Sequence, residues 1–236
     1  TGATTITANF TRTTRSYTVT IGRNNTGYGT VSSASVTVPY GTTYTTSGST
    51  LTFSNGTKIT ARANSQTAQY SYAFDDWSST SGTITGATTI TANFTRTTRS
   101  YTVTIKSNNT GYGTVNTSSV TVDYGTAITV SGNTIKIGST TITATPKTDT
   151  AQYDYSFLNW TGTEDTVTGT MTITANFDRD VKSYTVTWKN WNGSTLEADQ
   201  DVAYGTTPTY DGTTPTRTDV TYAYEFTGWS PAVSSV

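Results

Sequence analysis

The sequence holds few residues of the types that carry out chemistry, since histidine and cysteine are both absent. Neither a Ser-His-Asp triad nor an imidazole base can be built without histidine. Paired carboxylates remain, and Asp75-Asp76 is the clearest pair. The corresponding positions farther along the chain are Leu158-Asn159 and Thr227-Gly228, so no recurring chemistry rests on the pair. The sequence predicts solvated residues at a strand end, and no enzymatic activity.

A second group of carboxylates comes late in the chain. Glu197, Asp199 and Asp201 alternate with other residues between Leu196 and Val202, so they are expected to share one face of a strand. Calcium needs six or more oxygen ligands, usually including several carboxylates. The same pattern also suits a charged solvent face that blocks edge-to-edge pairing, and we favour that interpretation. We expect no metal and no cofactor.

Lysine and asparagine could form an isopeptide cross-link between strands. Lys106 and Lys189 follow the first strands of two units, and Asn93 and Asn176 lie in last strands. Gly22 stands where the first unit would need its lysine, and no acidic residue recurs as a catalyst. We therefore expect an unmodified chain.

Aromatic residues recur with a fixed spacing and are the main candidates for a core. Because other large apolar residues are scarce, aromatics must supply much of the buried area. The predicted structural core consists of Trp77, Trp160, Trp229, Phe74, Phe157 and Phe226.

A different set of aromatics stands in glycine-flanked turns. Tyr28 and Tyr112 occupy such turns, and Trp191 takes the comparable place near the C-terminus. Exposed aromatics repeated along a chain can stack on sugar rings or anchor a protein partner. The alternative is an aromatic lid over the end of each core. These three residues are the candidate surface contacts.

The chain is a tandem array. Residues 1–21 return letter for letter as residues 85–105, and a diverged copy occupies residues 168–188. The predicted units are 1–15, an orphan last strand with its linker; 16–98, repeat 1; 99–182, repeat 2; and 183–236, repeat 3, which is shorter and lacks its last strand. About five residues join one unit to the next, which predicts an elongated, fairly stiff rod.

Composition and periodicity predict an all-β fold, mainly antiparallel. Threonine, tyrosine and valine are plentiful, and apolar residues alternate with polar ones from Tyr17 to Ile21. Residues 24–29 should form a hairpin turn, and Asn55-Gly56 another. Asp75-Asp76 should bulge or end its strand. Tyr222 to Phe226 should form a strand of repeat 3.

Charge and hydropathy exclude two classes of partner. With Lys+Arg 14 against Asp+Glu 15 the net charge is −1, so a nucleic-acid backbone finds little to hold. No apolar run approaches the roughly 18 residues that read as a membrane span, so we expect no membrane insertion.

The order Tyr-Thr-Val-Thr, Gly-Thr-Val, Tyr-Gly-Thr, Phe-x-x-Trp, Thr-Ile-Thr-Ala-Asn-Phe resembles the InlB B-repeat family of bacterial surface proteins. Repeats 1 and 2 resemble its divergent branch. Repeat 3, with Phe226-Thr227-Gly228-Trp229, resembles the Listeria–Bacteroides type. The resemblance implies small β-rich modules, β-grasp-like in the last unit, in secreted or cell-wall-attached proteins.

The function that follows is a stalk of a bacterial cell-surface, adhesin-like protein that holds a distal domain away from the wall. An alternative is that the repeats themselves bind host glycans or surface proteins weakly, with avidity from many copies. A further hypothesis is head-to-tail self-association. Ile6, Ala8 and Phe10 carry the last-strand pattern, so they form a candidate donor strand for another molecule.

Overall fold

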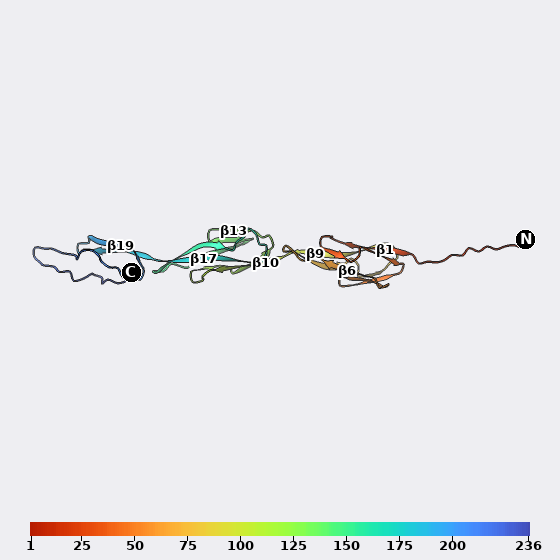
Figure 1. Cartoon of the computed structure of the whole chain (residues 1–236), viewed down its shortest axis with the longest axis horizontal. Helices are drawn as coiled ribbons and strands as arrows, with labels where there is room; N and C mark the ends of the chain where they lie inside the picture. Colours follow the sequence, from red (N-terminus) through yellow and green to blue (C-terminus); the bar gives the residue numbers. More distant parts are fainter. The chain divides into compact units, whose positions relative to one another are not determined.

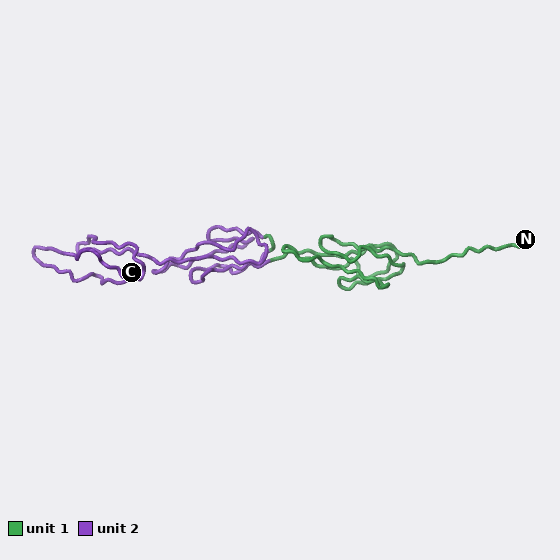
Figure 2. Tube along the Cα trace, in the orientation of Figure 1, with its two compact units in different colours: residues 1–100, 123–125 green, residues 101–122, 126–236 purple.

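The computed structural model describes residues 1–236 and contains β-strands but no helix. Most strand pairs are antiparallel. The all-β, mainly antiparallel prediction is therefore confirmed. The chain divides into two compact units, drawn in different colours in Figure 2. Unit 1 is Thr1–Ser100 with Asp123–Gly125, and unit 2 is Tyr101–Val122 with Thr126–Val236.

Unit 1 contains nine strands arranged in two sheets. The strands are β1 (Ser16–Arg23), β2 (Gly29–Val31), β3 (Ser35–Pro39), β4 (Thr43–Ser47), β5 (Thr50–Phe53), β6 (Lys58–Ala63), β7 (Tyr70–Trp77), β8 (Ser81–Thr83) and β9 (Thr88–Thr98). One sheet has the order β3-β1-β9-β7, and the other has the order β2-β6-β5-β4-β8.

The first and last strands of unit 1 lie side by side and run parallel. Val19 of β1 is paired with Thr88 of β9, and Ile21 with Ile90. On its other side β9 pairs antiparallel with β7. Because β1 and β9 run in the same direction, the chain enters this sheet at one end and leaves it at the other. The sequence did not predict this parallel pair.

The core of unit 1 fills the space between its two sheets. Alternate residues of β1 and β9 point inward, as the period of two requires, and meet Leu51 and Phe53 of the second sheet. The buried residues are Val19, Ile21, Val38, Leu51, Phe53, Ile59, Ala61, Trp77, Ile84, Ile90, Ala92 and Phe94.

Unit 2 begins with strands that follow the same order. They are β10 (Ser100–Ser107), β11 (Gly113–Val115), β12 (Ser119–Asp123), β13 (Ile128–Ser131), β14 (Thr134–Ile137), β15 (Thr140–Pro146), β16 (Tyr153–Thr161) and β17 (Met171–Val181). The first residue of β10 and the last residue of β12 are assigned to unit 1. The sheets are β12-β10-β17-β16 and β11-β15-β14-β13. Again the first and last strands are parallel, with Val103 paired with Met171 and Ile105 with Ile173.

Residues 183–236 form only part of such a pattern. β18 (Ser183–Lys189) and β19 (Thr195–Ala203) make a two-stranded sheet. The strand predicted at Tyr222 to Phe226 does not form, and that prediction is wrong for this structure. The reason lies in unit 1: β7 has β9 as its only neighbour in the sheet, and residues 183–236 contain no strand equivalent to β9. Residues 222–226 have no strand to pair with.

Two predicted hairpins have different outcomes. The turn at Asn55-Gly56 does join β5 to β6, with Gly56 at φ 89°, as predicted. The turn at residues 24–29 does not make a hairpin, because β2 pairs with β6 in the other sheet. Both edges of β1 are already taken by β3 and β9, so β2 has no edge to join. The predicted bulge at Asp75-Asp76 is confirmed by a register shift between Phe74 and Trp77.

The segment before β1 forms no strand. Residues 1–15 carry no secondary structure, and every side chain from Thr1 to Arg15 is exposed. Figure 1 shows this segment as an extended tail that precedes β1. The same letters at residues 88–98 make β9, so the sequence alone does not decide whether this segment pairs.

Gly113, the first residue of β11, is buried against the ring of Phe177. A Cβ at this position would lie 2.4 Å from the ring of Phe177. We therefore expect Gly113→Ala to displace that ring and to lower the free energy of unfolding by about 1–3 kcal/mol, the usual cost of overpacking. Thermal unfolding measures the loss, and hydrogen exchange along β17 localises it.

The matched control is Gly169→Ala, because nothing lies within 4 Å of a Cβ at Gly169 and its φ is not in the left-handed region. Equal destabilisation by the two substitutions would contradict the role given to Gly113.

Candidate functional site

A single residue joins the last strand of one repeat to the first strand of the next. Arg99 stands between β9 and β10, and Lys182 stands between β17 and β18. The Arg99 N–H donates to the Gln69 carbonyl at 2.9 Å, and the Arg99 carbonyl accepts from the Tyr124 N–H at 2.8 Å. All three residues belong to unit 1. Both backbone groups of the linking residue are therefore satisfied.

Lys182 repeats this arrangement inside unit 2. Its N–H donates to the Gln152 carbonyl at 2.9 Å, and its carbonyl accepts from the Tyr204 N–H at 2.8 Å. The ammonium of Lys182 lies 3.1 Å from a carboxylate oxygen of Asp154, and this hydrogen bond raises the pKa of the lysine. The Tyr184 hydroxyl also donates to the Ala151 carbonyl. Contacts from repeat 2 thus reach the linking residue Lys182 and Tyr184, the second residue of β18.

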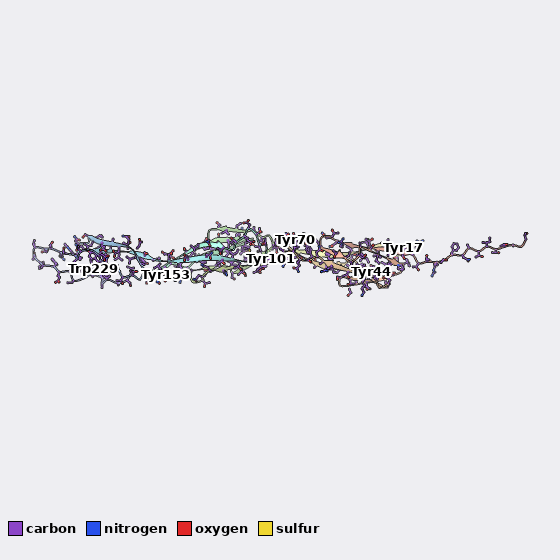
Figure 3. All side chains as sticks on the ribbon, viewed as in Figure 1. Tyr17, Tyr44, Tyr70, Tyr101, Tyr153 and Trp229 are labelled. Carbon is purple, nitrogen blue, oxygen red and sulfur yellow. The ribbon has the colours of Figure 1, made fainter.

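An arginine of each last strand is held between tyrosines. In unit 1 the Arg96 guanidinium lies 4.1 Å from the ring centre of Tyr70 and 5.2 Å from that of Tyr28. The Tyr28 ring in turn contacts the Tyr72 ring at 5.8 Å between centroids. Cation–π attraction favours this stacking. Tyr70, labelled in Figure 3, connects the cluster to β7.

The same aromatic–arginine cluster appears twice in unit 2. Arg179 lies 4.1 Å from the ring centre of Tyr153 and 5.0 Å from that of Tyr112. In residues 183–236 the arginine comes from a different segment. Arg217 lies 4.0 Å from the ring centre of Tyr224 and 4.5 Å from that of Trp191.

These clusters include the three aromatics singled out as surface contacts. Tyr28 and Tyr112 are half-buried and pack against the cores of their units. Trp191 is 61% exposed, so it offers most of its surface to a partner. The two tyrosines therefore contribute to the packing of their cores, whether or not they also contact a partner. Trp191 leaves most of its side chain exposed.

The predicted core aromatics occupy two kinds of position. Trp77 and Trp160 are buried, and each contacts the preceding phenylalanine at 5.6–5.8 Å between ring centroids. Phe74 and Phe157 are half-buried and meet the phenylalanines of β9 and β17 edge to face. Both indole N–H groups are without an acceptor in the protein, so these tryptophans act through their apolar area.

Trp229 belongs to an aromatic group in residues 183–236. Its ring lies 4.8 Å from Trp188, 4.9 Å from Tyr210 and 5.2 Å from Phe226, and Figure 3 labels Trp229 within this region. Trp188 is buried, but Phe226 is 39% exposed. This core is less closed than those of repeats 1 and 2.

Sequence reasoning missed an asparagine that clamps each last strand. The Asn24 amide donates to the Phe94 carbonyl at 2.9 Å and accepts from the Phe94 N–H at 3.0 Å. Asn108 makes both bonds to Phe177 at 3.0 Å. The available signal was the recurrence of Asn-Asn immediately after the first strand. By itself that dipeptide indicates only a turn.

The three carboxylates of β19 do not share one face. Asp201 has φ 56°, and the register between β18 and β19 shifts beside it. Asp199 and Val202 are half-buried, whereas Asp201 between them is exposed. Asp199 accepts from the Trp188 indole N–H at 2.9 Å. Glu197 accepts from two backbone N–H groups, and desolvation followed by its hydrogen bond with Asp199 raises its pKa. The expectation of one carboxylate face is wrong, because a bulge reverses the alternation.

The two asparagines considered for cross-linking have partners of their own. Asn93 donates to Asp76 at 2.7 Å, and Asn176 donates to Asn159 at 2.7 Å, so the asparagines considered for cross-linking bind the residues around the bulge. No group of three or more Asp or Glu side chains is placed to hold a metal ion. The structure also has no helix of the length and apolarity that crossing a membrane requires.

Two adjoining clefts open on residues 183–236. One, of about 490 Å³, lies between Val186–Lys189 of β18 and residues 229–236. The other, of about 450 Å³, is lined by Trp191, Arg217 and residues 224–230. Both clefts include Lys189 and Trp229, so they lie on one continuous surface.

Comparison with protein-family models, curated proteins and solved structures gives no match for this chain. The resemblance to InlB B-repeats rests on its short ordered motifs alone.

The asparagine clamp generates a prediction in repeat 2. Replacing Asn108 by alanine leaves the N–H and the carbonyl of Phe177 without their side-chain partner in a partly buried place. We expect the free energy of unfolding to fall by about 1–3 kcal/mol, the cost of leaving such groups unsatisfied. Chemical unfolding followed by tryptophan fluorescence measures this loss.

Asn176→Ala is the control, because it removes the same side chain one residue before Phe177, where the bonds are exposed and join side chains only. A loss no larger than that of the control would show that the clamp is not needed.

Proposed function

We propose that this chain is a structural spacer: a tandem array of β-modules that sets distance and direction in a bacterial cell-surface protein. The observation that carries the proposal is the parallel pairing of first and last strands, β1 with β9 and β10 with β17. A chain that leaves a sheet at the end opposite its entry advances along the strand direction with every repeat. An antiparallel pair would return it to its starting end.

The linking residues support the same proposal. Arg99 and Lys182 each make hydrogen bonds through both backbone groups, and each stands alone between two strands. Short linkers with few free dihedral angles restrict bending. We infer an elongated rod in which neighbouring repeats of the same chain are the first partners.

The resemblance to InlB B-repeats supplies the location. It suggests an extracellular, cell-surface or cell-wall-attached protein in which these modules hold a distal domain away from the wall. The β-grasp-like topology that the resemblance implies for residues 183–236 stays a prediction, since only β18 and β19 pair there. We propose no enzymatic role, and the hydrogen bonds that Asp76, Asp199 and Glu197 accept within the fold support this proposal.

Small-angle scattering tests the rod. A compact chain of 236 residues has a radius of gyration of about 17–18 Å. We expect a value well above this for the monomer, obtained by extrapolating to zero concentration. Inserting Gly-Ser-Gly-Ser after Arg99 is expected to broaden the distribution of interatomic distances, because it lengthens the connection between β9 and β10 with flexible residues.

A compact radius of gyration, or an insertion without effect, would contradict the spacer. The same insertion within the exposed turn at Asn55-Gly56 is the control, because it leaves both linking residues intact.

Weak adhesion by the repeats is the second candidate, and the exposure of Trp191 favours it. A glycan and matrix-protein array probed with the chain tests this idea. We expect any binding to be lost in the triple variant Tyr28→Ala, Tyr112→Ala, Trp191→Ala. The single variant Trp191→Ala separates contact from folding, because the tyrosines also pack on the cores. If the chain binds none of the probes, the adhesion proposal is wrong and only the spacer proposal remains.

A further inference from the structure

The first and last strands of a complete repeat are joined by a short ladder of backbone pairs. In unit 1 five pairs connect β1 to β9, from Val19 with Thr88 to Arg23 with Ala92. In unit 2 five pairs connect β10 to β17 in the same way. The two strands are direct neighbours in the sheet, so tension applied to both ends of a repeat passes directly across this ladder.

The parallel direction of the two strands decides how the ladder is loaded. Unit 1 begins its sheet at Ser16, the first residue of β1, and ends it at Thr98, the last residue of β9. Pulling these ends apart slides the strands past each other along their own direction. Hydrogen bonds between strands lie across that direction, so all of them are loaded in shear at once. Two antiparallel strands pulled from the same end would instead open one bond at a time.

A side chain extends the ladder beyond its last backbone pair. The Asn24 N–H donates to the Ala92 carbonyl at 3.2 Å. The Asn24 side-chain amide then donates to the Phe94 carbonyl at 2.9 Å and accepts from the Phe94 N–H at 3.0 Å. Asn108 makes the corresponding three bonds in unit 2. The asparagine clamp thus adds two hydrogen bonds between the first strand and the last, and sliding must break them as well.

The core packs against one face of the ladder and shields it from water. Val19 and Ile21 of β1 and Ile90 and Ala92 of β9 are all buried. Sliding of the strands would expose this apolar surface while it breaks the hydrogen bonds. Bonds in a shielded place are costly to break, because water does not at once replace the lost partner.

Tension that leaves one repeat enters the next through a single residue. Arg99 alone separates β9 from β10, and Lys182 alone separates β17 from β18. Both linking residues are hydrogen-bonded through their N–H and carbonyl groups. The linkers therefore contain almost no free length that could extend before the ladders are loaded.

From this geometry we propose that each complete repeat is a load-bearing module, in which the parallel ladder between its first and last strands resists tension along the chain. The load-bearing elements are the β1–β9 ladder with Asn24 and the β10–β17 ladder with Asn108. The second sheet of each repeat lies outside this path and keeps the core closed. The inference rests on the proposed function, because a spacer transmits force between its two ends.

Single-molecule stretching of the full chain in two directions tests the ladder. The sequence has no cysteine, so pairs of cysteines introduced at exposed positions can hold the handles. Ser16→Cys with Thr98→Cys pulls β1 against β9 in shear. Gln66→Cys with Thr98→Cys pulls the start of β7 away from the end of β9, where Tyr70 pairs with Thr98, and unzips this antiparallel pair.

We expect the force that unfolds the chain in shear to be at least about twice the unzipping force at the same loading rate, because the ladder pairs share the load only in shear. Both handle pairs act on the same fold, so a difference in force reports the direction of pulling and not the equilibrium stability.

Equal forces in the two directions would overturn the load-bearing proposal and leave the spacer proposal untouched. A compact radius of gyration in scattering would contradict the spacer without changing the comparison of forces, because the handles fix the direction of pulling.

Asn24→Ala tests the contribution of the asparagine clamp. We expect the shear force to fall by about a quarter, since two of the bonds that share the load are lost, and the unzipping force to change by less than about a tenth. The matched control is Asn93→Ala, which removes an asparagine of β9 that binds Asp76 of β7 and should leave the shear force unchanged. Equal losses in both directions for Asn24→Ala would contradict the role given to the clamp.

Discussion

The backbone pairing of one strand decides how much of each repeat is ordered. β9 and β17 each lie between a parallel neighbour and an antiparallel neighbour, so each supplies hydrogen bonds to two strands at once. An unpaired strand edge leaves its N–H and carbonyl groups to water or to another chain. Where this strand is present, its neighbours form strands. In residues 183–236 it is absent, and the segment at 222–229 is irregular.

Several side-chain interactions depend on that same strand. Phe94 fills the space that Gly29 leaves open, receives both bonds of the Asn24 amide and meets Phe74 edge to face. Two positions later Arg96 stacks on Tyr70 of β7 and on Tyr28, which directly precedes β2. In residues 183–236 Arg217 takes the stacking role from another part of the chain. The aromatic–arginine cluster is thus present in all three repeats, but its arginine comes from a different segment in residues 183–236.

The sequence predicted most strands because their apolar residues alternate and their turns carry glycine or asparagine. The strand from Tyr17 to Ile21, the turn at Asn55-Gly56 and the bulge at Asp75-Asp76 follow from such local signals. The predictions that were wrong concern which strands pair with each other. Residues 24–29 look like a hairpin turn, yet the strand that follows pairs in another sheet, since both edges of β1 are filled. Residues 222–226 carry a strand pattern but have no strand beside them.

For the candidate sites, too, the sequence shows which residues recur, and only the tertiary structure shows their contacts and exposure. The recurrence of Tyr28, Tyr112 and Trp191 is visible in the sequence, but only packing shows that the tyrosines are half-buried and the tryptophan 61% exposed. The asparagine clamp joins residues 24 and 94, a separation at which no local pattern can signal a contact.

The sequence by itself determined that the chain is all-β and that last-strand letters occur both at residues 1–14 and at residues 85–98. Alternation and composition carry this information because they act within one strand. Only the tertiary structure decided which strands are neighbours, that the first and last of each full repeat run parallel, and that identical letters form β9 in one place and an exposed tail in another. Strand pairing is non-local, so the fate of such a segment depends on whether an open edge is available to it.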